Sequence, residues 1–278
     1  MSAAERRLTP PPLPAAVERL WSEIIAPCRR CLDHPTLGSR LSAETYIPFT
    51  TVGLLPIGAR GATYFLVGAE PSPAFETRDE AAERIRDGAR NFASGRNESC
   101  LQFAMEHWLL APGEGYYFTD LAKCTMPTDL AKKTPLRYDL CSDYFARELT
   151  GLRPRLIISS GLVAYRNLKR QKKSDWPTIF SVLHYSPAAR GWHKQVAALA
   201  TAEHRARVPS EAEFVAFIER RRQSYGYTRP SSKTIGLEHF RLLTAYSVQF
   251  AAICAMLANG RLATDDSLMV HVAPGSTT

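Results

Sequence analysis

Four short apolar runs, each separated from the next by a stretch with helical spacing, constrain the fold of this chain most strongly. The apolar runs are residues 62–68, 116–119, 156–158 and 178–183. The helical patterns between them are residues 97–111, 136–151 and 161–170. Apolar runs of this length are typical of strands that are buried on both faces, as in parallel sheets. The alternation therefore predicts an α/β fold, a three-layer α/β/α sandwich around a mainly parallel central sheet.

Two further regions flank this pattern. Residues 15–27 have the apolar spacing of a helix. Beyond about residue 200 the strands stop, and residues 209–223 and 236–259 are predicted to be helices, the second markedly apolar. We therefore expect residues 1–200 to form the α/β domain and residues 201–278 to form a C-terminal helical extension packed on it.

The composition indicates a soluble globular protein: of 278 residues, 45% are hydrophobic and 22% are charged. No apolar run approaches the ~20 residues that a membrane span requires, and residues 1–14 lack the apolar segment of a secretory signal. Six cysteines, spread unevenly over a long chain, do not form the pattern of a secreted disulfide scaffold. These features favour a cytoplasmic protein with no membrane partner.

The net charge suits a polyanionic partner. Thirty-five Lys and Arg residues against 27 Asp and Glu residues give a formal charge of +8. Basic residues gather at 169–173 and 220–222. Either cluster alone is equally well explained as the solvated face of a helix, so the charge permits nucleic acid binding without establishing it.

Polar or glycine-containing segments stand at the end of each predicted strand. Residues 68–73 read GAEPSP, residues 119–124 read TDLAKC, and residues 184–187 read HYSP. Around the third strand, residues 152–154 read LRP and residues 160–161 read SG. The carboxyl ends of parallel strands meet at one edge of the sheet, where functional residues of such folds gather. Taken singly, each segment is also compatible with an ordinary turn.

In this order and strand context, the segments resemble those of the uracil DNA glycosylase superfamily, most closely its iron–sulfur branch. That family carries G-E-A-P-G after the first strand, T-N-x-x-K-C after the second, L-R-P-x-x-I-x-x-x-G around the third and a final H-P-S. The resemblance covers about residues 16–195 and includes residues 88–96 (GARNFASGR), similar to the family loop G-R-P-F-V-G-R. It implies a DNA glycosylase that acts as a monomer on duplex DNA with a flipped base, or on single-stranded DNA, and leaves an abasic site.

The resemblance also suggests a use for four of the six cysteines. Cys28 and Cys31 form a C-x-x-C, Cys124 follows the second strand, and Cys141 lies on the next helix. In the iron–sulfur branch, cysteines at these places hold a [4Fe–4S] cluster, and thiolates are suitable ligands for iron. A zinc site made by the same cysteines, or plain buried thiols, remain open alternatives, although zinc ribbons usually pair two C-x-x-C knuckles.

The resemblance implies two catalytic residues. Glu70 would orient the attacking water and stabilise the sugar cation, while His184 would donate a hydrogen bond to a carbonyl oxygen of the departing base. Here the turn reads GAEP, so the carboxylate is displaced by one position from the family's G-E-A-P, and a surface acid is the alternative for Glu70. Tyr185 replaces the family's proline after the histidine.

Other positions would bind the base or the DNA. The residues expected in the base pocket, besides those already named, are Gly68, Ala69, Phe92, Asp120, Tyr185 and Ser186. Phe92 would stack on the base, although a single phenylalanine is more often a core residue. Arg190, Lys123 and Ser160 are expected to contact DNA, and Arg190 could fill the space that the flipped base leaves.

Asp120 replaces the asparagine that the family places against the base. An ionised aspartate only accepts hydrogen bonds, so it disfavours the O4 acceptor of uracil and suits the amino donor of cytosine. Excision of ordinary cytosine would destroy the host's own DNA, so the predicted substrate is a modified cytosine, such as phage glucosylated hydroxymethylcytosine. The alternatives are uracil repair with a protonated Asp120 or a bridging water, a non-catalytic DNA-binding module, and an Asp120 that only caps a turn.

Overall fold

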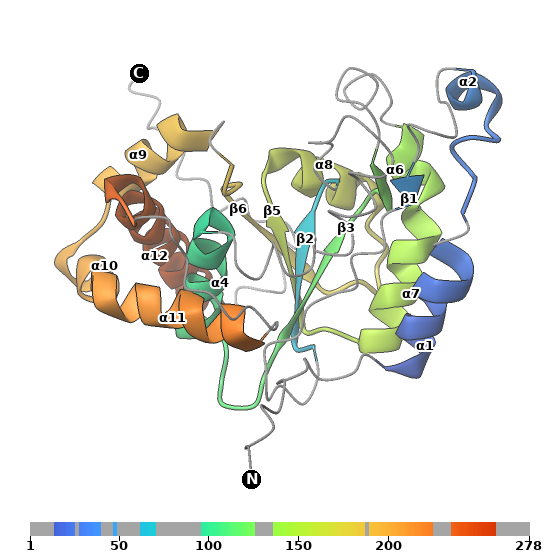
Figure 1. The fold of residues 1–278 in the computed structure, drawn as a ribbon. Helices are drawn as coiled ribbons and strands as arrows, with labels where there is room; N and C mark the ends of the chain where they lie inside the picture. The colour runs from blue at the N-terminus through green and yellow to red at the C-terminus, as the bar shows by residue number, and fades with distance from the viewer. Residues whose placement is uncertain are drawn as a thin grey trace, which may run out of the picture.

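The computed structural model describes residues 14–25, 28–39, 47–48, 62–70, 96–125, 136–186, 189–224 and 235–259. Within these ranges a central sheet lies between two layers of helices (Figure 1). This arrangement confirms the predicted α/β/α fold.

The central sheet has four strands, and every neighbouring pair is parallel. The strands are β2 (Tyr64–Gly68), β3 (Tyr116–Asp120), β5 (Leu156–Ser160) and β6 (Thr178–Val182). Their order across the sheet is β3-β2-β5-β6, so β2 and β5 are central. A separate antiparallel pair joins β1 (Ile47–Pro48) to β4 (Cys124–Thr125). All four predicted apolar runs are strands.

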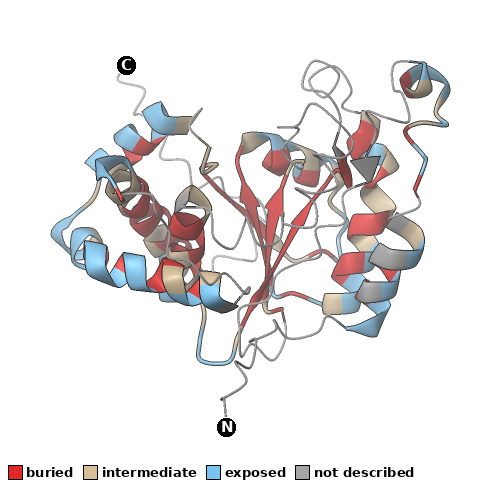
Figure 2. Ribbon diagram, viewed as in Figure 1, coloured by how far each residue is buried: buried red, intermediate tan, exposed pale blue. Residues whose placement is uncertain are grey.

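Each strand is buried on both faces because alternate side chains enter two different cores. In β2, Leu66 faces the core beneath α4 (Arg96–Trp108) and α12 (Leu237–Ala258). Phe65 and Val67 face the opposite core, beneath α7 (Ser142–Leu152) and α8 (Leu162–Gln171). Figure 2 shows the consequence: the strands are buried along their length, and the helices are buried on their inner sides.

The remaining helices complete the two layers. On the α7 side lie α1 (Ala15–Arg19), continued by a π-helical turn at Leu20–Ile25, and α6 (Leu136–Leu140). On the α12 side lie α9 (Arg190–Ala198), α10 (Ala202–Ala206) and α11 (Glu211–Ser224). A short α2 (Pro35–Gly38) follows the C-x-x-C.

The C-terminal helix α12 is a core element of this structure. Tyr246, Phe250 and Ile253 are completely buried and belong to the same core as Leu66 of β2. By length and composition alone α12 could cross a membrane, with a mean hydropathy of 1.5, but half of that apolar window is buried inside the protein. Its apolar character is explained by packing against α4, α9 and β6.

Two local features differ from the sequence-based prediction. The helix expected over residues 136–151 is divided into α6 and α7, and Cys141 stands between them as the residue before α7. Residues 190–198 form α9, which the apolar spacing did not indicate. At this division the Cys141 thiol is hydrogen bonded to Cys124 of β4 and to the backbone of Lys123.

Candidate active site at the carboxyl edge of the sheet

Three of the predicted site residues lie just after, or at, the carboxyl ends of strands. Glu70 follows β2, Asp120 is the last residue of β3, and His184 follows β6. Because the strands are parallel, these ends share one edge of the sheet. Gly68 pairs in register with Asp120, and a Cβ added to Gly68 would lie only 2.1 Å from Asp120 Oδ1. Glycine at position 68 therefore makes room for the Asp120 carboxylate over the β2 backbone.

Asp120 is buried in a place that disfavours its charge. Its side chain lies at the β3 end with 8% of the residue exposed. Burial raises the pKa of Asp120 to about 7; Lys123 opposes this shift, and the nearby Glu148 adds to it. Both the protonated and the ionised form of Asp120 are therefore populated near neutral pH. The group that faces Asp120 then decides whether its side chain donates a hydrogen bond or only accepts.

A fully buried polar network supports the backbone at Asp120. Lys123 Nζ donates to Thr119 Oγ1 at 2.7 Å, to the Asp120 carbonyl at 2.5 Å and to Glu148 Oε2 at 2.7 Å. Tyr117 donates to the other Glu148 oxygen at 2.8 Å. Since Lys123 is 1% exposed and its ammonium has three internal partners, it does not present a charge to DNA, which corrects the role expected from the sequence.

His184 is held as a neutral imidazole. Its Nδ1 accepts a hydrogen bond from the Ser186 backbone N–H at 3.0 Å, which leaves Nε2 to carry the proton. Burial, with a smaller contribution from His193, lowers the pKa of His184 to about 4. The ring stacks on Tyr185 with centroids 4.3 Å apart. A neutral Nε2–H donor is thus available at all pH values well above 4.

Gly161 allows this histidine to lie against the end of β5. A Cβ at Gly161 would lie 3.0 Å from His184 Cβ, and the glycine has φ of +91°, which side chains rarely adopt. The His184 carbonyl is bonded to His193 Nε2 of α9 at 2.8 Å. The loop that carries the histidine is therefore fixed from β5 and from α9.

Glu70 forms an ion pair with Arg137, a residue of α6 that the sequence-based reasoning did not select. Arg137 is almost fully buried, whereas the Glu70 side chain is 29% exposed. The ion pair with Arg137 anchors the Glu70 side chain at the edge of the site.

The four cysteines proposed as ligands are all buried. The Cys124 thiol is hydrogen bonded to both Cys31 and Cys141. The hydrogen bond with Cys124 lowers the pKa of Cys31, and it lowers the pKa of Cys141 to about 7. Cys28 accepts a hydrogen bond from Tyr144 at 3.2 Å, which connects it to the first turn of α7 just after Cys141.

These four residues form a buried, sulfur-only donor set. The hydrogen bonds that lower the pKa of Cys31 and Cys141 raise the pKa of Cys124 well above its ordinary value. In the described part of the chain, no group of three or more His, Cys, Asp or Glu side chains has the arrangement of a metal site. Cys100 and Cys254 belong to the core beneath α12 and take no part in the set.

The other predicted site residues are placed as follows. Ala69 lies between Gly68 and Glu70 at the end of β2 and is partly buried. The Ser160 hydroxyl, at the end of β5, is buried and has no hydrogen-bond partner within the described ranges. Ser160 is 1% exposed, so it does not form part of the DNA-contacting surface expected from the sequence. Phe92, with most of the 88–96 loop, lies outside the described residues.

Arg190 is exposed at the start of α9 and forms an ion pair with Glu238 of α12. Neither Glu238 nor Arg137 was selected from the sequence, because each lies on a helix far along the chain from its partner. When the two members of an ion pair are far apart in the sequence, the residues around either one do not indicate that a partner exists. Glu148 could have been found, since an acid on the inner face of a predicted helix requires a buried partner.

At the carboxyl edge of the parallel sheet, Glu70 and Asp120 supply carboxyl groups and His184 supplies a neutral imidazole. This is a polar site of the type that binds ligands across the strand ends of α/β folds. A family model described as the uracil DNA glycosylase superfamily matches residues 55–208, which is more than half of the chain. The chain therefore belongs to that superfamily, a class of DNA glycosylases. No curated protein matches the sequence.

Proposed function

We propose that the protein is a monofunctional DNA glycosylase that hydrolyses the base–deoxyribose bond of a modified cytosine, such as glucosylated hydroxymethylcytosine of phage DNA. The observation that carries this proposal is the Asp120 carboxyl at the end of β3, packed over Gly68 where the base edge would lie. When ionised, it offers only acceptors, which match the 4-amino donor of cytosine. A cytosine amino group would also stabilise the carboxylate and so favour the charged form.

The residues of the site support hydrolysis without a covalent intermediate. Glu70, paired with Arg137, orients a water molecule and stabilises the positive charge that develops on the sugar. His184 donates from Nε2 to a carbonyl oxygen of the departing base, and its low pKa keeps it from competing for the proton of the water. Lys123 is bound by Glu148 and Thr119, which argues against a lysine nucleophile at this position.

The same proposal includes a [4Fe–4S] cluster held by Cys28, Cys31, Cys124 and Cys141. Support comes from the burial of this all-sulfur donor set and from the hydrogen bonds that join Cys124 to Cys31 and Cys141. When bound, the cluster would supply structural cross-linking among the N-terminal segment, the end of β3 and α7. Zinc on the same cysteines is the competing ligand, and metal analysis distinguishes the two.

A second candidate function is the repair of uracil in DNA, and the pKa of Asp120 favours it. With a pKa of about 7, part of the protein carries a protonated Asp120 at neutral pH. A carboxylic acid can donate to uracil O4 and accept from N3–H, as an asparagine amide does. The two candidates require opposite protonation states of one side chain, so they predict opposite pH dependence.

The test uses the full chain with matched duplexes that contain uracil, ordinary cytosine or the modified cytosine, together with single-stranded versions of each. Abasic sites are scored by alkaline strand cleavage. We expect abasic sites with the modified cytosine and none with ordinary cytosine. Faster excision of uracil than of every cytosine derivative would replace the first function by the second, and binding without any excision would leave a DNA-binding module.

The proposed biological role is anti-phage defence in the cytoplasm, where phage DNA is replicated. This role follows from the substrate, because removal of a base that only invading DNA carries leaves the host chromosome intact. Plating of phages with and without the modified cytosine on cells that express the protein tests it. Equal protection against both phages would contradict the role.

A further inference from the structure

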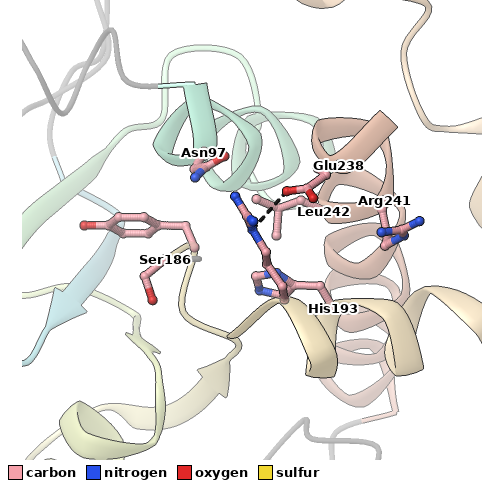
Figure 3. A pocket seen from close by; sticks show the side chains of 8 residues that line it. Asn97, Ser186, His193, Glu238, Arg241 and Leu242 are labelled. Atoms are coloured by element: carbon pink, nitrogen blue, oxygen red, sulfur yellow. Dashed lines mark ion pairs between the residues drawn. The ribbon is translucent and has the colours of Figure 1, made fainter. Parts of the chain in front are cut away.

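A small polar pocket lies next to the His184 loop, outside the three-residue site described above. It is lined by residues of the loop itself, of α4, of α9 and of the first turns of α12 (Figure 3). The lining residues are Asn97, Tyr185, Ser186, Arg190, His193, Glu238, Arg241 and Leu242. The α12 residues lie outside the matched range 55–208, so this wall is supplied by the part of the chain to which the family model gives no role.

An exposed ion pair crosses the pocket. Arg190 Nε lies 2.9 Å from Glu238 Oε2, and the two side chains are 63% and 55% exposed. Arg190 lies on α9 and Glu238 on α12, and the dashed line in Figure 3 marks their ion pair, with Asn97 of α4 nearby. An ion pair with this much exposure contributes little to stability, on the order of 0–1 kcal/mol. It is therefore easily opened by a competing anion.

The other polar groups of the pocket are mostly hydrogen-bond donors. Arg241 has no carboxylate partner among the described residues. The Asn97 amide and the Ser186 hydroxyl also line the space, and among the described lining residues Glu238 is the single acidic side chain. With the ion pair in place, the space of about 30 Å³ is enough for a water molecule. An anion that binds both guanidinium groups has to replace Glu238 as the partner of Arg190.

We propose that this pocket binds a backbone phosphate of the DNA strand, with Arg190 and Arg241 as its ligands and Glu238 as an internal counter-ion that the phosphate displaces. The proposal rests on the proposed function, since it supposes DNA at the His184 loop. Two guanidinium groups are well suited to a phosphodiester, which accepts from both. The position beside the loop would place that phosphate on the strand from which the base is flipped. The helix α12 is then part of the DNA-binding surface.

The salt dependence of DNA binding tests this exchange. Each phosphate neutralised by a protein cation releases counterions and contributes about 0.9 to the slope of log affinity against log salt concentration. In the wild type, Arg190 leaves Glu238 as it reaches the phosphate, so the freed Glu238 takes up a cation and Arg190 adds little to the slope. In Glu238→Gln, Arg190 has no internal partner and its full contribution appears.

The experiment measures the affinity of the full-length protein for an undamaged duplex over a range of sodium chloride concentrations. We expect Glu238→Gln to bind about two- to fivefold more tightly, equivalent to an exposed ion pair, and to steepen the slope by about one. Arg241→Gln should weaken binding and flatten the slope by about one. Adding Arg190→Gln to Glu238→Gln should restore the wild-type slope.

The matched control is Arg155→Gln, because Arg155 also faces a carboxylate, Glu114, but precedes β5 at the opposite edge of the sheet. It should change neither affinity nor slope. Unchanged slopes in both Glu238→Gln and Arg241→Gln would overturn the proposal. If Arg241→Gln and Arg155→Gln changed the affinity and the slope equally, the effect would be one of net charge in general. That result would also overturn the proposal.

Inorganic phosphate distinguishes DNA from a small anion as the occupant. At equal ionic strength, sodium phosphate should displace the duplex no better than sodium chloride. Specific competition by phosphate, together with α12 variants that bind DNA normally, would make the pocket a small-anion site and refute the DNA assignment. If the wild type binds no DNA at all, the proposed function fails; if it binds DNA but ignores these substitutions, only this inference fails.

Discussion

At the scale of single residues, the chemistry of this site depends on the environment that burial imposes on two titratable groups. Burial raises the pKa of Asp120 to about 7 and lowers the pKa of His184 to about 4. Both shifts favour the neutral form, as expected when a charge is removed from water. The histidine is therefore a constant donor over the physiological range, whereas the aspartate changes its hydrogen-bonding character within that range.

The substitution Asp120→Asn should change the choice of base. The amide can donate to uracil O4, and it loses one acceptor for the cytosine amino group. Reading one wrong base edge costs ~1–3 kcal/mol, so the preference should move toward uracil by about tenfold to a hundredfold. Single-turnover rates on matched oligonucleotides measure the ratio without interference from product release. A ratio that does not change would mean that Asp120 only caps a turn.

The pH dependence should have opposite signs for the two bases. As the pH rises through about 7, Asp120 loses its proton, so excision of the modified cytosine should rise and any excision of uracil should fall. His184 should contribute no inflection between pH 6 and 8. Asp120→Asn should remove the inflection near 7, and its persistence in that variant would assign it to another group.

A folding control accompanies this profile. The folded-state pKa of Asp120 lies above its ordinary value of 3.8, so its contribution to stability is lost as the pH rises through about 7. Circular dichroism at each pH therefore has to show a folded protein before rates are compared.

Removal of either catalytic group should slow base excision and spare binding. Glu70→Gln keeps the size of the side chain but removes the charge that Arg137 holds in place. His184→Ala removes the Nε2–H donor. We expect each variant to lose at least ~10²-fold in single-turnover rate, the low end of what one such group contributes. Duplex affinity should stay nearly constant, and a near-normal rate in either variant would move the assignment to another residue.

At the scale of secondary-structure elements, the strands could be predicted and the breaks between helices could not. Within residues 62–68, consecutive positions are apolar from Phe65 to Val67, because Leu66 enters one core and Phe65 and Val67 enter the other. The division of α6 from α7 at Cys141 has no such signal, since the apolar spacing continues across it. Cys141, which stands at the break, is hydrogen bonded to Cys124, and this contact between distant parts of the chain has no local sequence signal.

The positions of the candidate site residues were predictable to the extent that these residues stand at strand ends. Glu70, Asp120 and His184 all do so, and the structure places them at one edge. Arg137 and Glu238 could not be selected, because their partners are distant in the sequence and nothing local requires a charge at either position. Lys123 is expected from the resemblance to contact DNA, and its buried partner Glu148 lies on another element, so no local signal indicates the ion pair.

The cysteine-bearing elements lead to a prediction about metal. The purified protein should be brown, absorb near ~400 nm and contain about four irons per chain. Cys124→Ser should lose iron and solubility, because Cys124 lies between two other thiols. The matched control is Cys254→Ser, whose thiol donates to the Trp108 carbonyl in the core beneath α12. Stoichiometric zinc without iron after anaerobic preparation, or equal effects of the two substitutions, would contradict the prediction.

At the scale of the whole molecule, the sheet couples two cores that lie on its opposite faces. One core contains residues of α4, α11 and α12, and the other contains residues of α1, α7 and α8. Strand β6 contributes to both, through Phe180 on one face and Ile179 on the other. Although the family match ends at residue 208, α12 therefore completes the core on which the matched segment depends.

This coupling predicts that a cavity in α12 destabilises the entire fold. Phe250 is completely buried between α12 and the sheet, and a Phe→Ala change in such a core costs ~3–5 kcal/mol through lost transfer energy and the cavity that remains. Phe250→Ala should lower the free energy of unfolding by that amount in chemical denaturation. Leu237→Ala, on the same helix but 74% exposed, is the control and should stay within ~0.5 kcal/mol of the wild type.

Hydrogen exchange followed by mass spectrometry shows whether the loss of stability in Phe250→Ala extends over the whole fold. Protection should fall equally in α12, in β5, and in α7 on the far side of the sheet. If protection fell in α11 and α12 alone, the C-terminal helices would be a separate folding unit, and the position of Arg241 at the DNA surface would have to be tested apart from the stability of the α/β domain.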